Sequence, residues 1–388
     1  MSKYIEKKIG IYLHIPFCIK KCSYCAFNSL PSGGVPKEYL QAVYKEIEWT
    51  SSLFNLKDQA ADTIYFGGGT PSLLSPEEVE GFLGSIRSGY DLSENAEITL
   101  ELNPTAQDEL NIKGYRRAGI NRLSIGVQSF DEKNLKFLGR LHGAREAESS
   151  FAGARKAGFD NISIDLICGL PGQRISDVKA DLDRALKLNP EHISLYLLSI
   201  ENGTPLYRAV RTGSFLPLHD EMQGEIYQCA SEYLRANGYN RYETSNYARE
   251  GFESKHNMRY WSGEDYIGVG AGAHSFISDI GWGMRHWNLK PPHEYIKSIE
   301  GDMLPLEELE ILTRSDAIRD YVLTALRIST GLTEEMLNKK FAISMFEALS
   351  EEALRMLPTD IYIHEEGHMR LTEKGALMAD EVAARLLI

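Results

Sequence analysis

The chain has few cysteines, no long apolar run and no excess of positive charge. Only five of its 388 residues are cysteine, and residues 1–8 lack the apolar stretch of a signal peptide, which together exclude a disulfide-rich secreted protein. No apolar run approaches the roughly 20 residues of a membrane-spanning helix. The formal net charge of −13 argues against binding nucleic acid or an anionic membrane through a basic face. We therefore expect a cytoplasmic protein that has no transmembrane segment and binds no nucleic acid.

Three of the cysteines, Cys18, Cys22 and Cys25, lie close together with the spacing C-x3-C-x2-C, directly after a strand-like run. Three thiolates on one short loop can bind three irons of a 4Fe–4S cluster, and no fourth cysteine is near enough to bind the last iron. A structural zinc site requires four ligands, and His14 lies on the preceding strand rather than at the usual spacing. The spacing favours the iron–sulfur cluster. A zinc site, a disulfide with a spare thiol and a chance cluster are the alternatives.

Up to about residue 200, short apolar strands alternate with longer helical patterns. This alternation predicts βα units around a parallel sheet, and therefore an α/β fold. Pro36 begins a helix whose apolar residues Tyr39, Val43 and Ile47 lie on one stripe, so that the helix can cover the sheet. The six expected strands comprise residues 9–15, 63–66, 97–102, 122–127, 162–167 and 193–198.

Each expected strand ends in a glycine, cysteine or polar residue. In parallel βα folds the functional residues collect at the carboxyl ends of the strands, so these positions predict one ligand pocket beside the cysteine loop. The glycine run 67–69 is compatible with a tight turn, but three glycines also expose backbone N–H and C=O groups to a ligand, and we favour that interpretation. After the cysteine loop, the second, third, fourth and sixth strands end in Gly67 to Pro71, in Glu101 and Asn103, in Gln128 and in Ser199. The fifth strand carries Asp165 and is followed by Gly169-Leu170-Pro171-Gly172.

These features resemble the radical S-adenosylmethionine (SAM) superfamily. The resemblance rests on the cysteine loop together with the turn Gly68-Gly69-Thr70-Pro71. It implies a partial (β/α)6 barrel, in which the amino and carboxylate groups of SAM bind the open iron and the reduced cluster cleaves SAM to a 5′-deoxyadenosyl radical. The protein then supplies binding, orientation and exclusion of water.

Within this superfamily the chain is similar to the subgroup of the oxygen-independent coproporphyrinogen III dehydrogenase HemN and its relative HemW. The segments 12–18 (YLHIPFC), 101–104 (ELNP), 126–130 (GVQSF) and 165–171 (DLICGLP) carry the resemblance, which extends over nearly the whole chain. By position, the resemblance implies that the SAM contacts are Tyr12, Tyr24, Gly68, Gly69, Thr70, Glu101, Gln128, Arg140, Asp165 and Ser199.

The roles implied for these contacts agree with their chemistry. Gly69 and Thr70 would meet the amine of SAM. Glu101 and Asp165 could accept hydrogen bonds from the ribose hydroxyls or the amine, and Arg140 could pair with the carboxylate. An acidic residue at a strand end is also common as a helix cap or ion-pair partner, and an arginine is common as a solvated helix residue.

Two departures separate this chain from the dehydrogenase. Where the dehydrogenase has a further cysteine, this chain has Ala26-Phe27, and in this respect it is like HemW. The first strand begins near residue 9, so we expect no long N-terminal segment that could close over a porphyrinogen substrate. These departures weaken the expectation of decarboxylase activity.

The segment 256–261 (HNMRYW) resembles the H-N-x-x-Y-W motif that marks HemW and is implicated there in heme binding. His256 could bind iron through a neutral imidazole nitrogen, while Tyr260 and Trp261 offer aromatic faces to a flat macrocycle. From the residues alone, a packed histidine with two core aromatics would be favoured. The resemblance reverses this preference for the motif, but not for His256 as the actual iron ligand, and His256 stays a candidate heme contact.

From about residue 301, helical patterns are followed by a hairpin-like stretch over 361–371 and a last helix, an order that resembles a winged helix. Winged helices often bind DNA, but this stretch contains 17 acidic and 9 basic residues, which favours packing or binding a protein partner. We expect a radical SAM core over residues 1–235, a connecting segment with the motif over 236–300, and an α+β C-terminal domain over 301–388.

Two functions are compatible with these features. The first is a heme chaperone that binds heme and delivers it to an acceptor protein, with the cluster and SAM in a supporting role and no residue assigned to catalysis. The second is an oxygen-independent coproporphyrinogen III dehydrogenase, which acts by oxidative decarboxylation. The motif and the short N-terminus favour the first. The resemblance further implies a 4Fe–4S cluster, SAM and heme as cofactors and an electron donor such as a flavodoxin or ferredoxin, and it leaves a homodimer open.

Overall fold

The computed structural model describes residues 7–54, 59–104 and 108–387. The expectation that no signal peptide is present falls mainly on residues 1–6, which lie outside this description. Among the described residues, no helix combines the length and the apolar character needed to cross a membrane.

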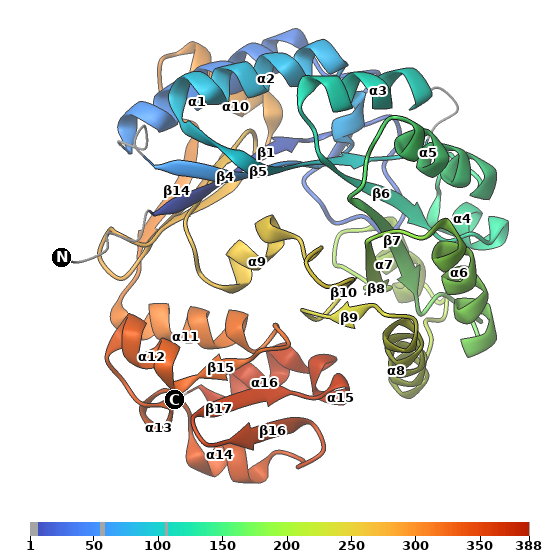
Figure 1. Ribbon diagram of the computed structural model, residues 1–388, viewed down its shortest axis with the longest axis vertical. Helices are drawn as coiled ribbons and strands as arrows, with labels where there is room; N and C mark the ends of the chain where they lie inside the picture. Colours follow the sequence, from blue (N-terminus) through green and yellow to red (C-terminus); the bar gives the residue numbers. More distant parts are fainter. Residues whose placement is uncertain (1–6, 55–58, 105–107, 388) are drawn as a thin grey trace.

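The centre of the fold is a twisted sheet that contains all six predicted strands (Figure 1). These strands lie side by side in the order of the chain and pair in parallel, as βα units require. The predicted α/β architecture is therefore confirmed. The six strands are β1 (Lys8–Ile15), β4 (Ala60–Gly68), β5 (Asp91–Leu102), β6 (Arg122–Gln128), β7 (Ile162–Cys168) and β8 (His192–Leu197).

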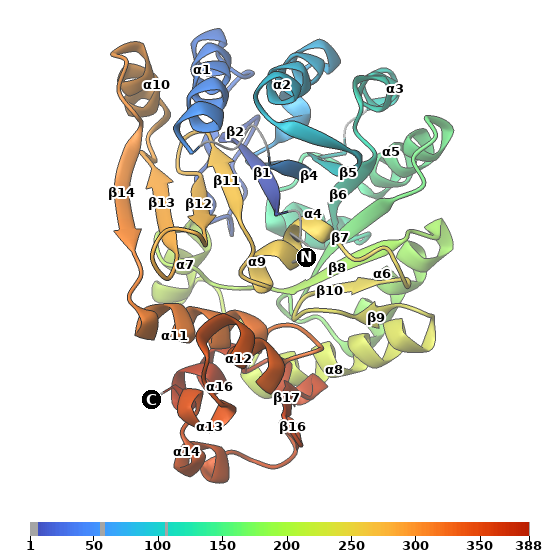
Figure 2. The same ribbon diagram turned by 60° about the vertical axis from the view of Figure 1, so that its left-hand side comes forward.

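Further strands extend the sheet on both sides, to twelve strands in all among the described residues. On one side β11 pairs in parallel with β1, and β12, β13 and β14 follow in antiparallel pairs (Figure 2). On the other side β10 pairs with β8 and β9 with β10, both antiparallel. The bounds are β9 (Asn240–Arg241), β10 (Asn246–Ala248), β11 (Tyr266–Val269), β12 (His274–Ile277), β13 (Met284–Asn288) and β14 (Leu306–Ile311).

Helices cover the outer face of this sheet (Figure 2). The predicted apolar stripe of the first helix is buried at Tyr39, Val43 and Ile47. The next helix begins with a capping box, in which the Glu78 N–H donates to the Ser75 hydroxyl and the Ser75 N–H donates to the Glu78 carboxylate. The covering helices are α1 (Lys37–Leu53), α2 (Pro76–Gly89), α3 (Asp108–Ala118), α5 (Ala144–Lys156), α6 (Ile175–Leu188), α8 (Asp220–Ala236) and α10 (Pro292–Glu300).

Short elements surround the carboxyl ends of the central strands. The cysteine loop lies between two short strands that pair with one another, β2 and β3. A short helix after β6 is capped by Asp131, which accepts two backbone N–H bonds, and ends at Gly139 in the left-handed conformation. The bounds are β2 (Phe17–Cys18), β3 (Leu30–Pro31), the 3₁₀ helix η2 (Pro71–Leu73), α4 (Glu132–Leu138) and α7 (Pro205–Arg211).

The C-terminal part has a hydrophobic core of its own, with buried residues from Leu312 to Leu386. The predicted hairpin is present as β16 and β17, and β15 completes a small antiparallel sheet. The division at residue 301 stays a prediction, because β14 still pairs with β13 of the large sheet. The elements are α11 (Arg314–Ala325), β15 (Leu332–Thr333), α12 (Glu334–Phe341), α13 (Met345–Ala348), α14 (Glu351–Met356), β16 (Tyr362–Glu365), β17 (His368–Leu371), α15 (Glu373–Ala376) and α16 (Ala379–Leu386).

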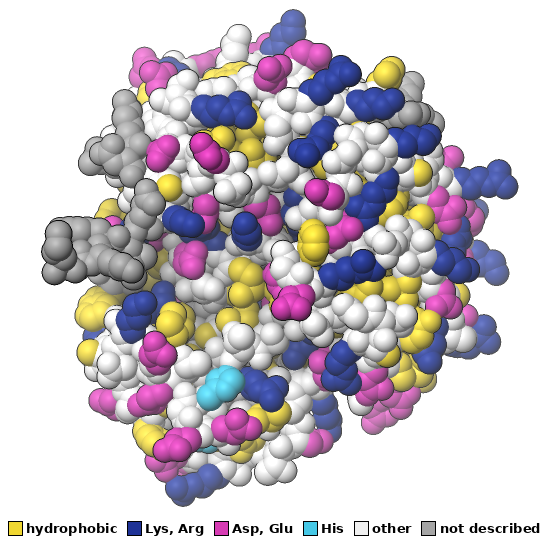
Figure 3. Space-filling model, in the orientation of Figure 1, with side chains coloured by type: hydrophobic (Ala, Val, Ile, Leu, Met, Phe, Trp, Pro, Cys, Tyr) yellow, Lys and Arg dark blue, Asp and Glu magenta, His cyan; other side chains and the backbone are white. Residues whose placement is uncertain are grey.

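The helix α9 (Lys255–Trp261) carries the HNMRYW segment and lies between the large sheet and the C-terminal part (Figure 1). It begins at Ser254, whose hydroxyl accepts the N–H of Asn257. On the face of the molecule shown in Figure 3, acidic and basic side chains are interspersed, so neither sign of charge dominates that face.

Candidate cofactor site

A cavity of about 450 Å³ lies at the carboxyl ends of the central strands. Its lining brings together residues from the cysteine loop, the glycine turn after β4 and the ends of β5 to β8. Tyr12 and His256 are the two predicted site residues that do not line it. The predicted residues in the lining are Cys18, Cys22, Cys25, Tyr24, Gly68, Gly69, Thr70, Glu101, Gln128, Arg140, Asp165 and Ser199.

All three predicted cluster cysteines have free thiols and line this cavity. Among the described residues, no three His, Cys, Asp or Glu side chains are grouped around the position of a single metal ion. A 4Fe–4S cube binds each thiolate through a different iron, so it does not require three sulfurs to converge on one point. The donor set therefore fits such a cluster better than a lone zinc ion.

The cysteine loop is fixed by hydrogen bonds to its own ends and to the sheet. The Lys21 ammonium donates to the carbonyl oxygens of Phe27 and Ser29, at 3.0 and 2.9 Å. The Asn28 amide donates to the Ala271 carbonyl at 2.9 Å, and the Asn28 carbonyl lies 2.8 Å from His14 Nε2. These contacts place the loop over the ends of β1 and β11.

The glycine turn has less free hydrogen-bonding capacity than the sequence indicates. The Gly68 N–H donates to Glu101 at 3.1 Å, and the Gly69 N–H donates to the Ile15 carbonyl at 2.8 Å. Gly68 has a φ of 115°, which favours glycine. A side chain at Gly69 would meet the Phe17 carbonyl oxygen at 2.7 Å. The expectation of exposed N–H groups is therefore wrong for these two residues, and their small size serves the close approach of the turn to the cysteine loop.

Glu101 is a buried carboxylate at the cavity wall. It accepts hydrogen bonds from the Tyr65 hydroxyl at 2.9 Å and from the Gly68 N–H at 3.1 Å. The pKa of Glu101 is raised to about 7, chiefly by burial and also by the neighbouring Asp165, while its hydrogen bonds act in the opposite direction. Glu101 is thus poised to exchange a proton near neutral pH or to stabilise a cationic ligand.

Asp165 is held by hydroxyl groups on neighbouring strands. The Ser124 hydroxyl lies 3.0 and 2.9 Å from its two oxygens, and the Ser163 hydroxyl lies 3.1 Å from one of them. Burial raises the pKa of Asp165 in spite of these bonds. The two acidic side chains therefore give the cavity an acidic wall that a cation would stabilise.

Arg140 connects this wall to the cysteine loop. Its guanidinium donates to the Asn103 side chain at 2.5 Å and to the Gly126 carbonyl at 2.8 Å, and Nη1 lies 3.7 Å from Cys22 Sγ. Arg140 Nε is buried and has no hydrogen-bond partner among the described residues. Gln128, at the end of β6, adopts a left-handed φ of 69°. Arg140 is therefore an anchored residue of the rim rather than a solvated helix residue.

Sequence reasoning missed several residues of this cavity. Ser124 and Tyr196 line it from β6 and β8, and Asn103, recognised only as a strand end, holds Arg140. The signal was available for Ser124, because side chains alternate along a strand and Ser124 precedes Gln128 by an even number of positions. Tyr196 lies two positions after Ser194, so both side chains are on the same face of β8. The Ser194 hydroxyl is near that of Ser163, which indicates that this face points inward.

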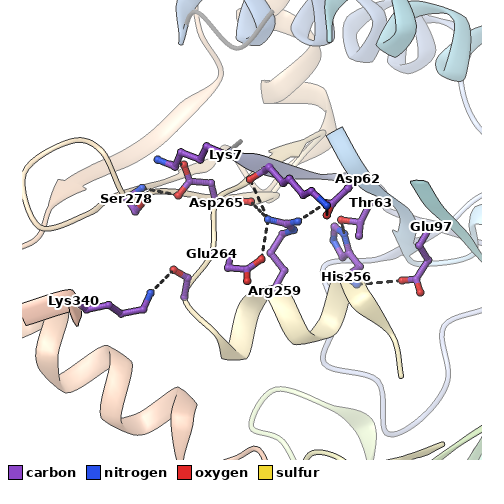
Figure 4. A network of polar contacts seen from close by, with 12 residues as sticks. Lys7, Asp62, Thr63, Glu97, His256, Arg259, Glu264, Asp265, Ser278 and Lys340 are labelled. Carbon is purple, nitrogen blue, oxygen red and sulfur yellow. Dashed lines mark hydrogen bonds and ion pairs between the residues drawn. The ribbon is translucent and has the colours of Figure 1, made fainter. Parts of the chain in front are cut away.

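His256 does not line this cavity. It lies on α9 (Figure 4). It is fully buried, with Nδ1 at 2.8 Å from the Thr63 hydroxyl and Nε2 at 2.8 Å from the Tyr260 hydroxyl. Burial lowers the pKa of His256 to about 3, so the imidazole is neutral. Both ring nitrogens are occupied, and binding iron would require one of these bonds to break. Tyr12 stacks on His256 with 6.3 Å between ring centroids, and its hydroxyl bonds His14.

The contacts of α9 explain why the HNMRYW segment is buried. Arg259 pairs with Asp62, lies 3.1 Å from Glu264 and donates to the Lys8 carbonyl at 3.2 Å (Figure 4). The His256 N–H donates to Glu97 at 3.1 Å. Lys8 lies at the beginning of β1, Asp62 near the beginning of β4 and Glu97 within β5. The helix α9 is therefore fixed near the end of the strands opposite to the cysteine loop.

Comparisons with known proteins agree with this geometry. The model of the radical SAM superfamily matches residues 12–185. The heme chaperone HemW of Lactococcus lactis is 34% identical over 99% of this chain and 98% of its own length. HemW of Bacillus subtilis is 36% identical over 97% of this chain and 98% of its own length. HemW of Escherichia coli is 40% identical over 70% of each chain.

A solved structure shares the fold. Coproporphyrinogen III oxidase (HemN) from Escherichia coli matches with a TM-score of 0.83 over 99% of this chain and 91% of its own, at 24% identity. This likeness confirms the predicted fold, a radical SAM barrel followed by an α+β C-terminal part. Together with the identity to HemW proteins over nearly the whole length, it shows that the chain belongs to the HemW family of the radical SAM superfamily.

Proposed function

We propose that this protein is a heme chaperone, which binds heme and delivers it to an acceptor protein. The observation that carries the proposal is the similarity over nearly the whole chain to proteins named heme chaperone HemW, at 34% and 36% identity. The HNMRYW segment supports it from within the chain. Heme and a heme-accepting protein are the proposed partners, a flavodoxin or ferredoxin the proposed electron donor, and a homodimer the proposed assembly.

Cys18, Cys22 and Cys25 would hold a 4Fe–4S cluster, and SAM would lie beside it in the same cavity. Together these groups supply one-electron chemistry when they are bound. The Arg140 guanidinium lies 3.7 Å from Cys22 Sγ, so it stands between the cysteine loop and the space left for SAM. Its unpartnered Nε is a donor for the carboxylate of SAM.

The acidic wall would bind the cationic part of SAM. Glu101 and Asp165 are both buried, and the pKa of each is raised by burial. A bound amine or sulfonium would stabilise both carboxylates and lower these pKa values. The wall therefore selects a cationic ligand, and Tyr65 and Ser124 hold the two carboxylates in position.

The cluster is tested by anaerobic reconstitution with iron and sulfide. Cys22→Ser should lose most of the bound iron and the absorbance near 400 nm. Cys229→Ser removes a free thiol on α8, outside the cavity lining, and should keep both. A Cys22→Ser protein with the iron and sulfide content of the wild type would contradict the cluster assignment.

Heme delivery is tested by mixing the hemin-loaded protein with an apo heme protein and following the Soret band. We expect the band to change to that of the acceptor holoprotein, at a rate that rises with acceptor concentration. Transfer at the rate of hemin dissociation into solution, whatever the acceptor concentration, would contradict a delivery function.

A further inference from the structure

A second cavity, of about 490 Å³, lies between α9, the strands β11 to β13 and the helices α11 and α12. It shares no lining residue with the cofactor cavity. Its volume lies within the range of roughly 300–1,000 Å³ typical of small-molecule and cofactor sites. The cavity therefore has room for a ligand that the radical SAM site does not hold.

The walls of this second cavity are predominantly aromatic. Tyr260 and Tyr266 pack edge to face with 4.5 Å between ring centroids, and Tyr321 and Phe341 lie 5.7 Å apart. Such walls suit a flat, largely apolar ligand, because aromatic faces and edges offer large contact areas. The aromatic residues of the lining are Tyr260, Tyr266, Phe276, Trp282, Tyr321 and Phe341.

Two cations lie beside Phe341: Lys340 lines the cavity, and Arg314 lies behind the lining, against Phe341 and Trp282. The Lys340 ammonium donates to the Gly263 carbonyl at 3.3 Å and lies 5.2 Å above the Tyr321 ring. Arg314 donates to the Phe341 carbonyl at 2.7 Å and lies over the Trp282 ring. Neither cation forms an ion pair with a carboxylate among the described residues.

The other cation in the cavity lining, Arg285, differs from Lys340 and Arg314. Arg285 is paired at 2.7 Å with Glu310 and at 2.7 Å with Asp320. Its positive charge is therefore already balanced within the protein. The charge that an anionic ligand would meet comes from Lys340 and Arg314.

We propose that heme binds in this second cavity, with its macrocycle between the aromatic walls and its two propionates at Lys340 and Arg314. A flat apolar ring with two carboxylates at one edge matches both the aromatic walls and the pair of unbalanced cations. The inference rests on the proposed heme chaperone function and names the site at which heme would bind.

This placement gives the HNMRYW segment a supporting role. Tyr260 forms part of the cavity wall, and its hydroxyl is held by His256 Nε2 at 2.8 Å. The described residues of the lining include neither histidine nor cysteine, so the iron would take a phenol oxygen from Tyr266 or Tyr321. His256 is then a positioning residue, which holds the wall rather than the metal.

The site is tested by titrating the full-length protein with hemin and measuring the dissociation constant from the Soret band. Lys340→Gln removes one propionate partner and should weaken binding by about tenfold. Thr324→Trp places a large side chain at a half-buried position of the lining and should abolish binding. Lys339→Gln changes the exposed neighbour of Lys340 and should bind as the wild type does.

The outcomes separate the site from the function. If the wild type binds no hemin, the proposed function fails and this site with it. If the wild type binds hemin and both cavity variants bind it equally well, the site is wrong and the function stands. The unfolding midpoint and the reconstituted iron content of each variant must match the wild type, so that lost binding does not reflect misfolding.

The iron ligand has its own readout. The double variant Tyr266→Phe, Tyr321→Phe keeps the aromatic walls but removes both phenol oxygens, and it should change the visible spectrum of bound ferric heme. Tyr362→Phe removes a hydroxyl from β16, outside the cavity, and should leave the spectrum unchanged. An unchanged spectrum in the double variant would overturn the phenol ligand.

Discussion

At the residue scale, Gly69 sets how closely the turn after β4 approaches the cysteine loop. Its N–H donates to the Ile15 carbonyl, and an added Cβ would lie 2.7 Å from the Phe17 carbonyl oxygen and 2.9 Å from that of Ile15. Both neighbours are backbone atoms, which cannot rotate away. The glycine is therefore needed to pack the turn against the loop that carries Cys18.

Gly69→Ala should destabilise the protein by about 1–3 kcal/mol, because the extra methyl group forces the two backbones apart. It should also lower the iron content after reconstitution, since the loop is displaced. Gly84→Ala, on the exposed face of α2 with no atom within 4 Å of the added Cβ, should instead stabilise by up to about 1 kcal/mol. Denaturant unfolding and iron analysis measure both effects. Equal stability and iron content in the two variants would contradict this account.

Most of the cofactor cavity could be predicted at this scale, because strand ends are visible in the sequence. Glu101 and Gln128 lie at the ends of apolar runs and Asp165 within one, and parallel strands bring such positions together. The partners that hold them could not be predicted, because those partners depend on strand register. Ser124 bonds Asp165 only because β6 and β7 pair as they do.

At the scale of elements, α9 joins the sheet to the C-terminal part. Its Arg259 is buried, pairs with Asp62 and donates to the Asp265 carbonyl at 3.2 Å. A buried arginine keeps its charge, so loss of one partner leaves the other unbalanced. The position of the HNMRYW segment therefore depends on this ion pair.

Arg259→Gln should lower the free energy of unfolding by about 3 kcal/mol, because Asp62 loses its buried partner. Arg355→Gln breaks an exposed ion pair with Glu351 on α14 and should change stability by less than about 0.5 kcal/mol. Thermal and denaturant unfolding compare the two variants. A similar small effect in both would mean that the network of α9 contributes little.

Glu46 gives a pH dependence to the packing of α1. Its carboxylate is fully buried and accepts hydrogen bonds from Tyr295, Gly270 and Asn288, and burial raises its pKa from 4.5 to about 7. The folded protein thus keeps this proton over a pH range in which the unfolded chain has released it. The free energy of unfolding should therefore fall as pH rises from about 4.5 through 7.

Glu46→Gln removes this titration and should flatten the fall in stability over that pH range. Glu101, whose pKa is also raised to about 7, contributes a slope of the same sign, so part of the fall should persist. Glu48→Gln, at an exposed position of the same helix, should leave the slope as it is. Unfolding curves at several pH values test this. A slope unchanged by Glu46→Gln would contradict the assigned titration.

The six central strands could be predicted because they are buried on both faces and appear as apolar runs. The added strands could not. β11 and β12 are four residues each, and β11 contains Gly268, where an added Cβ would clash with the His274 carbonyl oxygen. Their pairing is set by contact with β1 rather than by a local pattern, and such a contact is not visible in the sequence.

At the scale of the whole molecule, the cofactor cavity and the second cavity are separate, and α9 contributes Tyr260 to the lining of the second one. A continuous chain of contacts joins them: Glu101 accepts from Tyr65, whose ring stacks on His256 at 5.2 Å, and His256 bonds Tyr260. Glu101 lines the cofactor cavity and Tyr260 the second one. The second cavity could not be predicted from the sequence, because it is formed by contacts between distant segments.

The most direct test of the heme chaperone proposal is made under anaerobic conditions, with the cluster reconstituted and with SAM and reductant present. Hemin and coproporphyrinogen III are added to separate samples, and the Soret band and porphyrin products are followed. We predict stable, stoichiometric hemin binding and no formation of protoporphyrinogen. Decarboxylated product together with deoxyadenosine release, and no retained hemin, would show a dehydrogenase and contradict the chaperone assignment.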